Sequence, residues 1–308
     1  MQDPFSVNIV YGLGFWLKDY GYYPKHWPLY SYMDHGITLH DTIPPHELNN
    51  EAPIIFKFSP RLVELYKKQS TKPVFPILNP YIHYRHKHKI CKSENAANTL
   101  FFPAHSTDEI DDATDWQDFI NRLKTIPPEF GGIDICLHPT DMKKGLDRVF
   151  GSQGYKVFTA GNPYDPAFTQ KMYAILRNYK YTMSNIPGSY LFYSVEMGIP
   201  FSLFGNEPLY HNLKDPNVEK GQYTSYKQNT TYQKAVALFS GSNTTITADQ
   251  AAFVDFELGK TSSISRMKTC FLLYKAAAIY LYRHPEARRP FFSSTYKGAK
   301  AYLKQKFR

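Results

Sequence analysis

The chain of 308 residues is 43% hydrophobic and 20% charged and carries a formal net charge of +9, a profile typical of a globular protein with a basic bias. This charge favours anionic partners, such as phosphorylated ligands, nucleic acid or an anionic membrane surface, and argues against basic ones. Three cysteines far apart in sequence, with no Cys-x-x-Cys pair, argue against a disulfide framework and a zinc knuckle and favour a reducing compartment. The first residues lack the basic start and apolar run of a signal peptide, so a cytoplasmic location is expected.

The length exceeds the usual size of a single core, which predicts two lobes, the first over residues 1–92. This lobe is expected to be a small α/β unit. Extended segments are predicted at 30–39, 54–58 and 74–78, and Ser59-Pro60 is typical of a helix start.

A polar turn follows the first of these extended segments. Asp34 or His35 could act as a general base on an acceptor hydroxyl, and Gly36 would permit a close approach of the backbone. The alternative is a buried structural histidine. A further candidate base is Glu109, although its acidic neighbours at 108–112 favour a solvated helix start over a catalytic site.

The second lobe is predicted over residues 93–228, after a basic stretch at 84–97 that lacks apolar periodicity and is expected to be an exposed linker. Strands and helices then alternate regularly, which predicts a doubly wound parallel sheet. The predicted strands are 99–103, 133–137, 155–159, 181–183 and 201–204, and the predicted helices are 116–125, 143–151, 167–179 and 189–197.

The third part, residues 229–308, is expected to contain C-terminal helices at 231–239, 248–258 and 265–282 that pack back on the first lobe. A basic tail, 283–308, interleaves Lys and Arg with aromatic residues. This pattern fits docking on an anionic membrane surface, at the inner face of the plasma membrane, and the alternative is an ordinary exposed terminal helix.

Polar turns follow the predicted strands of the second lobe. In open α/β sheets, ligands bind outside the carboxyl ends of the strands, so these turns are expected to meet around one ligand. The candidate donor-binding and phosphate-binding residues are His105, Ser106 and Thr107 after the first strand, His138 and Pro139 after the second, Asn162 after the third, and Ser184, Asn185, Gly188 and Ser189 after the fourth.

Two of these turns have groups that could bind a phosphate. A helix that begins at Gly188-Ser189 would offer unpaired N–H groups and a hydroxyl, and His138 could place an imidazolium beside the same anion. The alternatives are a histidine satisfied by a neighbouring carbonyl and, for Ser106 and Thr107, an ordinary helix cap.

Motifs that are missing from the sequence limit the chemistry. It contains no Gly-x-Gly-x-x-Gly after a strand, no P-loop and no Gly-x-Ser-x-Gly elbow. It also lacks an Asp-x-Asp next to a strand of the kind that holds a divalent ion in metal-dependent sugar-nucleotide enzymes. A metal-independent mechanism without a cofactor is therefore expected.

The second lobe resembles the donor-binding half of GT-B glycosyltransferases, and is most similar to the bacterial surface-polysaccharide group that includes CMP-sugar transferases for sialic acid and Kdo and the CDP-glycerol transferases. The resemblance is carried by His138-Pro139, by the turn from Ser184 to Ser189, and by Glu196-Met-Gly-Ile-Pro before the last strand, and it covers roughly residues 99–205. In the first lobe, only Asp34-His35-Gly36 is similar to the His-Gly turn of such enzymes. The acidic base of the sialyltransferases has no clear counterpart, and the first lobe is short for a GT-B acceptor domain.

The resemblance implies two Rossmann-like lobes and a transfer of sugar from a nucleotide-activated donor, with CMP-sugar preferred, to a glycan or glycolipid acceptor of a surface polysaccharide or lipopolysaccharide. His138 and the helix start at Ser189 would then hold the phosphate without a metal. The alternatives are a sugar-nucleotide epimerase of similar build and a non-enzymatic nucleotide- or nucleic-acid-binding module. Nucleic acid is not the expected partner, because no ribonucleoprotein motif is present.

Overall fold

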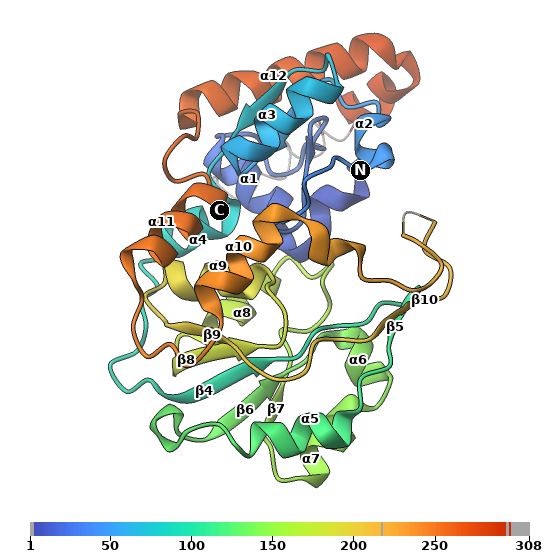
Figure 1. The fold of residues 1–308 in the computed structure, drawn as a ribbon. Helices are drawn as coiled ribbons and strands as arrows, with labels where there is room; N and C mark the ends of the chain where they lie inside the picture. Colours follow the sequence, from blue (N-terminus) through green and yellow to red (C-terminus); the bar gives the residue numbers. More distant parts are fainter. Residues whose placement is uncertain (1–2, 217, 294–295, 297–308) are drawn as a thin grey trace.

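The computed structural model describes residues 3–216, 218–293 and 296 (Figure 1). It confirms an α/β chain with two lobes, each built on a parallel sheet, and the C-terminal helix α12 (Arg266–Arg283) returns to the first lobe. The three strands of one sheet lie within residues 1–92 and the five of the other within 93–228. The division of the chain at residues 92 and 228 stays a prediction.

The first lobe has the strand order β1-β2-β3, with β1 at Tyr32–Met33, β2 at Ile55–Lys57 and β3 at Val74–Pro76, all parallel. The predicted extended segments are confirmed but are shorter than expected, because the chain leaves the sheet after Met33. Ser59 does precede a helix with Pro60 in its first turn. The helices are η1 (Ser6–Gly12), α1 (Leu13–Tyr20), α2 (Pro45–Leu48), α3 (Pro60–Gln69) and α4 (Pro80–Lys87).

The prediction of an exposed linker over 84–97 is wrong in its first part, since α4 runs through Arg85 to Lys87. Its N-cap Asn79 accepts a hydrogen bond from the Tyr81 N–H, and Pro80 occupies the first turn. The sequence of α4 shows no apolar periodicity, because its buried face includes tyrosine and histidine side chains beside isoleucine.

The second lobe has five parallel strands in the order β7-β6-β4-β8-β9 and confirms the predicted doubly wound sheet. Its strands are β4 (Ala97–Phe102), β6 (Ile133–Cys136), β7 (Val157–Phe158), β8 (Tyr179–Ser184) and β9 (Phe201–Leu203). Its helices are α5 (Trp116–Leu123), η2 (Pro128–Phe130), α6 (Pro139–Lys143), α7 (Leu146–Ser152), α8 (Phe168–Leu176) and α9 (Ser189–Glu196).

Side chains of β4 alternate between the two faces of this sheet. Phe101 packs into one apolar cluster with residues of α5 and α7, whereas Leu100 and Phe102 pack into another with residues of α8 and α9. Helices therefore cover both faces of the central strands.

A small antiparallel sheet lies beside the second lobe, with β5 (Ile110–Asp112), β10 (Tyr210–Asn212) and β11 (Gly221–Gln222) in the order β11-β10-β5. The acidic stretch 108–112 was expected to start a helix, and this is wrong. Pairing with β10, which comes about 100 residues later in the chain, makes it a strand.

The two lobes share a continuous apolar core. The ring of Tyr81 on α4 stacks on Tyr193 of α9 at 4.4 Å between centroids, and Tyr84 stacks on Tyr173 of α8 at 6.0 Å. Next to these rings, the Arg85 guanidinium binds the buried Glu196 carboxylate through two hydrogen bonds of 2.6 Å. Glu196, one of the residues that carry the GT-B resemblance, therefore joins the lobes.

Of the remaining helices, η3 (Ser225–Gln228), α10 (Thr230–Phe239) and α11 (Ala248–Glu257) follow the antiparallel sheet. Helix α10 packs beside β9 and α11 packs on α9, so both lie mainly against the second lobe, while α12 covers α1 of the first (Figure 1). Within the described part of the chain, no helix combines the length and the apolar character needed to cross a bilayer.

Candidate functional site

The strand order of the second lobe reverses between β4 and β8, because the chain moves outward from β4 through β6 to β7 and then returns to the other side of β4. Such a reversal separates the two loops at the carboxyl ends and is where ligands bind in open α/β sheets. Here the loop after β4 begins at Pro103 and the loop after β8 begins at Asn185. The first lobe lies above this edge of the sheet (Figure 1).

Two predicted ligand-binding histidines meet at this edge. His105 follows β4 and His138 follows β6, and their rings stack at 4.6 Å between centroids with 25° between planes. The Thr140 N–H donates to His138 Nδ1 at 3.3 Å, which leaves the ring proton on Nε2. In His105, Nδ1 lies 3.1 Å from the Ser106 carbonyl oxygen and donates to it.

His138 is neutral at pH 7, contrary to the expected imidazolium. Burial lowers its pKa to about 4, and the charges of His105 and Lys143 lower it further, while Asp108 opposes them. His138 therefore offers an uncharged N–H donor at Nε2. Its neighbour Pro139 begins α6, for which His138 is the N-cap residue.

Ser106 and Thr107 serve the loop itself. The Ser106 N–H and hydroxyl both donate to Asp141 Oδ1, at 3.1 and 2.5 Å, and Ser106 is buried. Thr107 Oγ1 accepts from the N–H groups of Glu109 and Ile110. The Ser106 bonds hold the His105 loop to the start of α6, and the Thr107 bonds close the turn before β5.

Ser184 and Asn185 are likewise buried, and their polar side-chain atoms form hydrogen bonds within the protein. Ser184 Oγ lies 2.8 Å from the Tyr190 hydroxyl, and Asn185 accepts from the Ala104 N–H at 2.7 Å and donates to the Asn206 carbonyl. Asn185 thus joins the loops after β4 and β8. Sequence reasoning placed both residues correctly at the edge but could not see that neighbouring loops use their polar groups.

The start of α9 meets the first lobe directly. The Ile37 N–H donates to Ser189 Oγ at 3.0 Å, and a Cβ added at Gly36 would lie only 3.2 Å from the same oxygen. Gly188 is needed because the Tyr190 ring folds over it, 2.6 Å from where a Cβ would stand. No side-chain hydrogen bond caps α9 at its N-cap Gly188, and the positive end of the helix dipole lies at this junction.

Asp34 is not a free base, because it belongs to a buried charge cluster. Lys57, only 1% exposed, donates to Asp34 Oδ2 at 2.8 Å and to Glu47, and Thr38 also donates to Asp34. Burial would raise the pKa of Asp34, but the adjacent Lys57 charge lowers it below its usual range. The same burial and the Asp34 charge raise the pKa of Glu47.

His35 is exposed at the junction and close to the second lobe. Desolvation by the protein around it lowers its pKa, and the charges of His105 and His46 add to this effect, while Asp34 opposes it. Its imidazole is therefore a neutral proton acceptor near pH 7. The Tyr11 ring, on a segment that precedes α1, lies 6.0 Å from it.

The two remaining candidates lie apart from these groups. Glu109 is exposed at the start of β5, and among the described residues no contact joins its side chain to His35 or His138. Asn162 is exposed after β7 and accepts from the Tyr164 N–H within its own turn. The structure thus pairs His105 with His138 at the sheet edge and Ser189 with the Gly36–Ile37 turn that follows His35.

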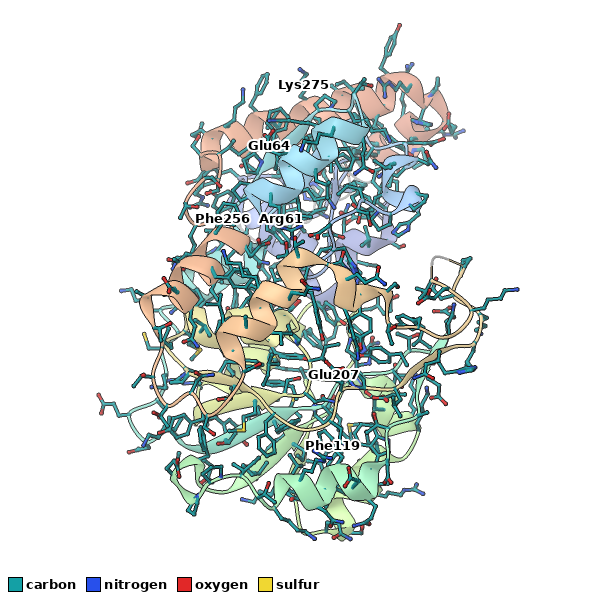
Figure 2. The ribbon with its side chains drawn as sticks, in the orientation of Figure 1. Arg61, Glu64, Phe119, Glu207, Phe256 and Lys275 are labelled. Atoms are coloured by element: carbon teal, nitrogen blue, oxygen red, sulfur yellow. The ribbon has the colours of Figure 1, made fainter. Side chains whose placement is uncertain are left out.

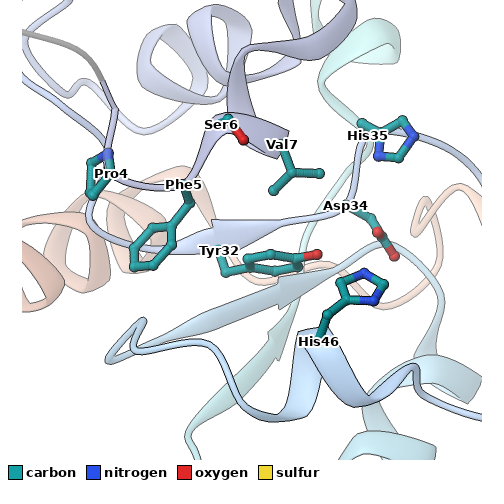
Figure 3. A pocket seen from close by; sticks show the side chains of 8 residues that line it. All are labelled: Pro4, Phe5, Ser6, Val7, Tyr32, Asp34, His35 and His46. Carbon is teal, nitrogen blue, oxygen red and sulfur yellow. The ribbon is translucent and has the colours of Figure 1, made fainter. Parts of the chain in front are cut away.

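A cavity of about 320 Å³ opens beside Asp34 and His35 in the first lobe. Figure 3 shows Asp34, His35 and His46 at one end of it and Pro4 and Phe5 at the other, with the Tyr32 ring between. A second cavity, about 280 Å³, lies in the second lobe beside Asp112, Asp141 and Lys144. Within the described part of the chain, no group of three His, Cys, Asp or Glu side chains is arranged to hold a metal ion.

Sequence reasoning missed Lys57, Asp141, His46 and Tyr11. Lys57 ends an otherwise apolar strand, Ile55–Lys57, where a charge facing a sheet core is an anomaly that could have been noticed. Asp141 follows His138-Pro139 in the sequence, but spacing gives no sign that it binds the neighbouring loop.

The lowered pKa of His138 predicts how the stability of the folded chain changes with pH. Because its folded pKa of about 4 lies below the ordinary value of 6.5, the unfolded chain binds the proton more readily. The contribution of His138 to stability is present above pH 6.5 and is lost as the pH falls toward 4. The urea midpoint should fall less between pH 7.5 and 5 in His138→Asn than in the unaltered chain, and an equal fall in both would contradict the assignment.

No protein-family profile matches the chain, and no characterised protein matches it in sequence. Solved structures that it resembles include the wall teichoic acid polymerase TagF (10% identity, 83% of this chain and 69% of that chain, TM-score 0.38). Another is a protein from Listeria monocytogenes assigned as a UDP-N-acetylglucosamine 2-epimerase (10% identity, 76% of this chain and 59% of that chain, TM-score 0.35). A third is the pneumococcal O-GlcNAc transferase GtfA in complex with UDP and GlcNAc (13% identity, 86% of this chain and 52% of that chain, TM-score 0.33). The chain spans a little over half the length of most of these structures. Similarity at this level identifies neither a donor nor a reaction.

Proposed function

We propose that the chain is a metal-independent glycosyltransferase that moves a sugar from a nucleotide-activated donor to a hydroxyl of a glycan or glycolipid. One observation carries the proposal. His105 and His138 stack on each other at the carboxyl edge of the sheet, and at the point where the strand order reverses the start of α9 contacts the Asp34–Ile37 loop of the other lobe. In this proposal, the edge of the second lobe binds the anionic donor, and His35 of the first lobe accepts the proton.

The donor phosphate would lie between the histidine pair and the α9 start. His138 Nε2–H donates a hydrogen bond, and the helix dipole favours negative charge at the same place. Both groups stabilise the charge that develops on the nucleotide as the bond from the sugar to the phosphate breaks. A CMP-sugar is the preferred donor on the family resemblance, with CDP-linked and UDP-linked donors as the alternatives.

His35 is the best candidate for the general base. Its depressed pKa keeps the ring neutral near pH 7, and it lies in the loop that touches α9, whereas the Asp34 carboxylate is held by Lys57. In the transfer, the acceptor oxygen bonds to the anomeric carbon, the nucleotide leaves with the bonding electrons, and the hydroxyl proton passes to His35. Asp34 is thus a positioning residue.

Calorimetric titration with CMP, UDP and CDP-glycerol tests the anion-binding edge. One of the three should bind the unaltered chain, and His105→Asn should weaken that binding by about tenfold or more, a loss of about 1.4 kcal/mol or more. His26→Asn, which alters an exposed histidine of the first lobe, is the matched control and should bind normally. Equal affinity in both variants would argue that the nucleotide binds elsewhere.

Incubation with a donor separates the rival functions. A glycosyltransferase needs an acceptor and forms a new glycoside, whereas an epimerase would interconvert the donor sugar with no acceptor present. Nucleotide binding without either product would indicate the non-enzymatic binding module.

A further inference from the structure

The outward face of α12 carries large apolar side chains, in contrast to the outward face of α3. Of the 12 large hydrophobic side chains that are exposed among the described residues, four lie on α12: Met267, Phe271, Tyr274 and Tyr282. Met267 is 69% exposed, Phe271 59% and Tyr282 80%. By contrast, α3 presents Glu64, Lys67 and Lys68 to solvent, as a surface helix ordinarily does.

These residues form one stripe along the helix. Positions 267, 271, 274, 278 and 282 are spaced by three or four residues, so they share one face. The opposite face is buried on the first lobe through Thr269, Leu272 and Ala276. Helix α12 therefore has two apolar faces, of which the described residues cover only one.

The charges beside the stripe are all positive. The 18 residues of α12 contain Arg266, Lys268, Lys275 and Arg283 and no acidic residue. Lys268 and Lys275 are exposed, and Figure 2 labels Lys275 at the outer edge of α12, on the far side of the first lobe from the second. The carboxylates of Glu51 and Glu286 lie beyond the helix end, where they face His284.

We infer that the outward face of α12 docks on an anionic phospholipid surface. A helix that lies on a membrane buries aromatic and aliphatic side chains at the headgroup boundary and keeps Lys and Arg near the anionic lipids. A second copy of the chain fits less well, because a two-fold contact through this face would bring like charges together without carboxylates to compensate them. This inference does not depend on the proposed transfer activity. The expected basic tail lies outside the described residues from 297 onward and carries no part of the argument.

Cosedimentation of the full chain with vesicles tests this inference. The chain should sediment with phosphatidylcholine vesicles that contain phosphatidylglycerol, and much less with phosphatidylcholine alone. Raising the salt from about 0.1 M to about 1 M should weaken binding, because the Debye length shortens from about 10 Å to about 3 Å.

Two double variants should each weaken vesicle binding by about tenfold or more: Met267→Ala with Phe271→Ala, and Lys268→Glu with Lys275→Glu. Matched controls alter exposed residues elsewhere, Val149→Ala with Leu209→Ala and Lys92→Glu with Lys124→Glu, and should bind normally. All variants keep the C-terminal tail, so its contribution is the same throughout, and circular dichroism checks that each is folded.

No sedimentation with anionic vesicles would overturn the inference, as would equal binding by the α12 variants and their controls. A dimer that the Met267→Ala and Phe271→Ala pair dissociates would instead identify a second copy as the occupant of this face. Nucleotide titration of the same variants tests membrane docking independently of the proposed transfer activity. The α12 variants should lose vesicle binding and keep their nucleotide affinity unchanged.

Discussion

Replacement of His138 by asparagine is expected to lower kcat for sugar transfer by about 100- to 1,000-fold, the range seen when one donor to a developing negative charge is removed. The asparagine side chain can still accept the Thr140 N–H bond that His138 Nδ1 accepts, so the start of α6 is kept. It cannot place an N–H donor where Nε2 stands. The measurement is the initial rate of transfer at saturating donor and acceptor near pH 7.5.

The unfolding transition of the same variant at pH 7.5 serves as its internal control and should be nearly unchanged. A variant that folds normally and transfers sugar at the original rate would remove His138 from the reaction. His211→Asn, which alters an exposed histidine on the antiparallel sheet of the same lobe, should retain full activity.

Substitution of Lys57 by methionine should lower the free energy of unfolding by about 3–5 kcal/mol, because it leaves two carboxylates buried without their cation. Asp34 and Glu47 both lie in the interior, and Lys57 is the only side chain that donates to both of them in the described structure. Urea denaturation at pH 7.5 measures the loss. The exposed Lys67→Met, on α3, is the matched control and should change the value by less than about 1 kcal/mol.

Adding Glu47→Gln to the Lys57→Met chain should restore part of the lost stability, since it removes one of the two unpaired charges. If Lys57→Met alone were as stable as the control, the cluster would have no structural role, and Asp34 would again be a candidate base.

Much of the fold could be predicted because its signals are local. Predicted strands and helices alternate regularly over residues 99–204, so a doubly wound sheet follows from this alternation alone. The turns with His105 and His138 follow parallel strands, so their presence at one edge could also be predicted.

The parts that could not be predicted depend on contacts between distant segments. Residues 110–112 form a strand only because Tyr210–Asn212 pairs with them, and Ser106 is occupied only because Asp141 lies beside it. The burial of Asp34 with Lys57 depends on the register of β1 against β2. Local spacing carries none of this information, so the hydrogen-bond partners of these serine, asparagine and aspartate side chains could not be predicted.

A crystal structure of the chain soaked with cytidine monophosphate is the most direct test of the central claim that a nucleotide phosphate binds where the sheet order reverses. The account predicts phosphate density within hydrogen-bonding distance of His138 Nε2, on the side that faces the start of α9. Phosphate bound instead in the cavity beside Asp112 and Lys144, with the histidine pair unoccupied, would contradict it.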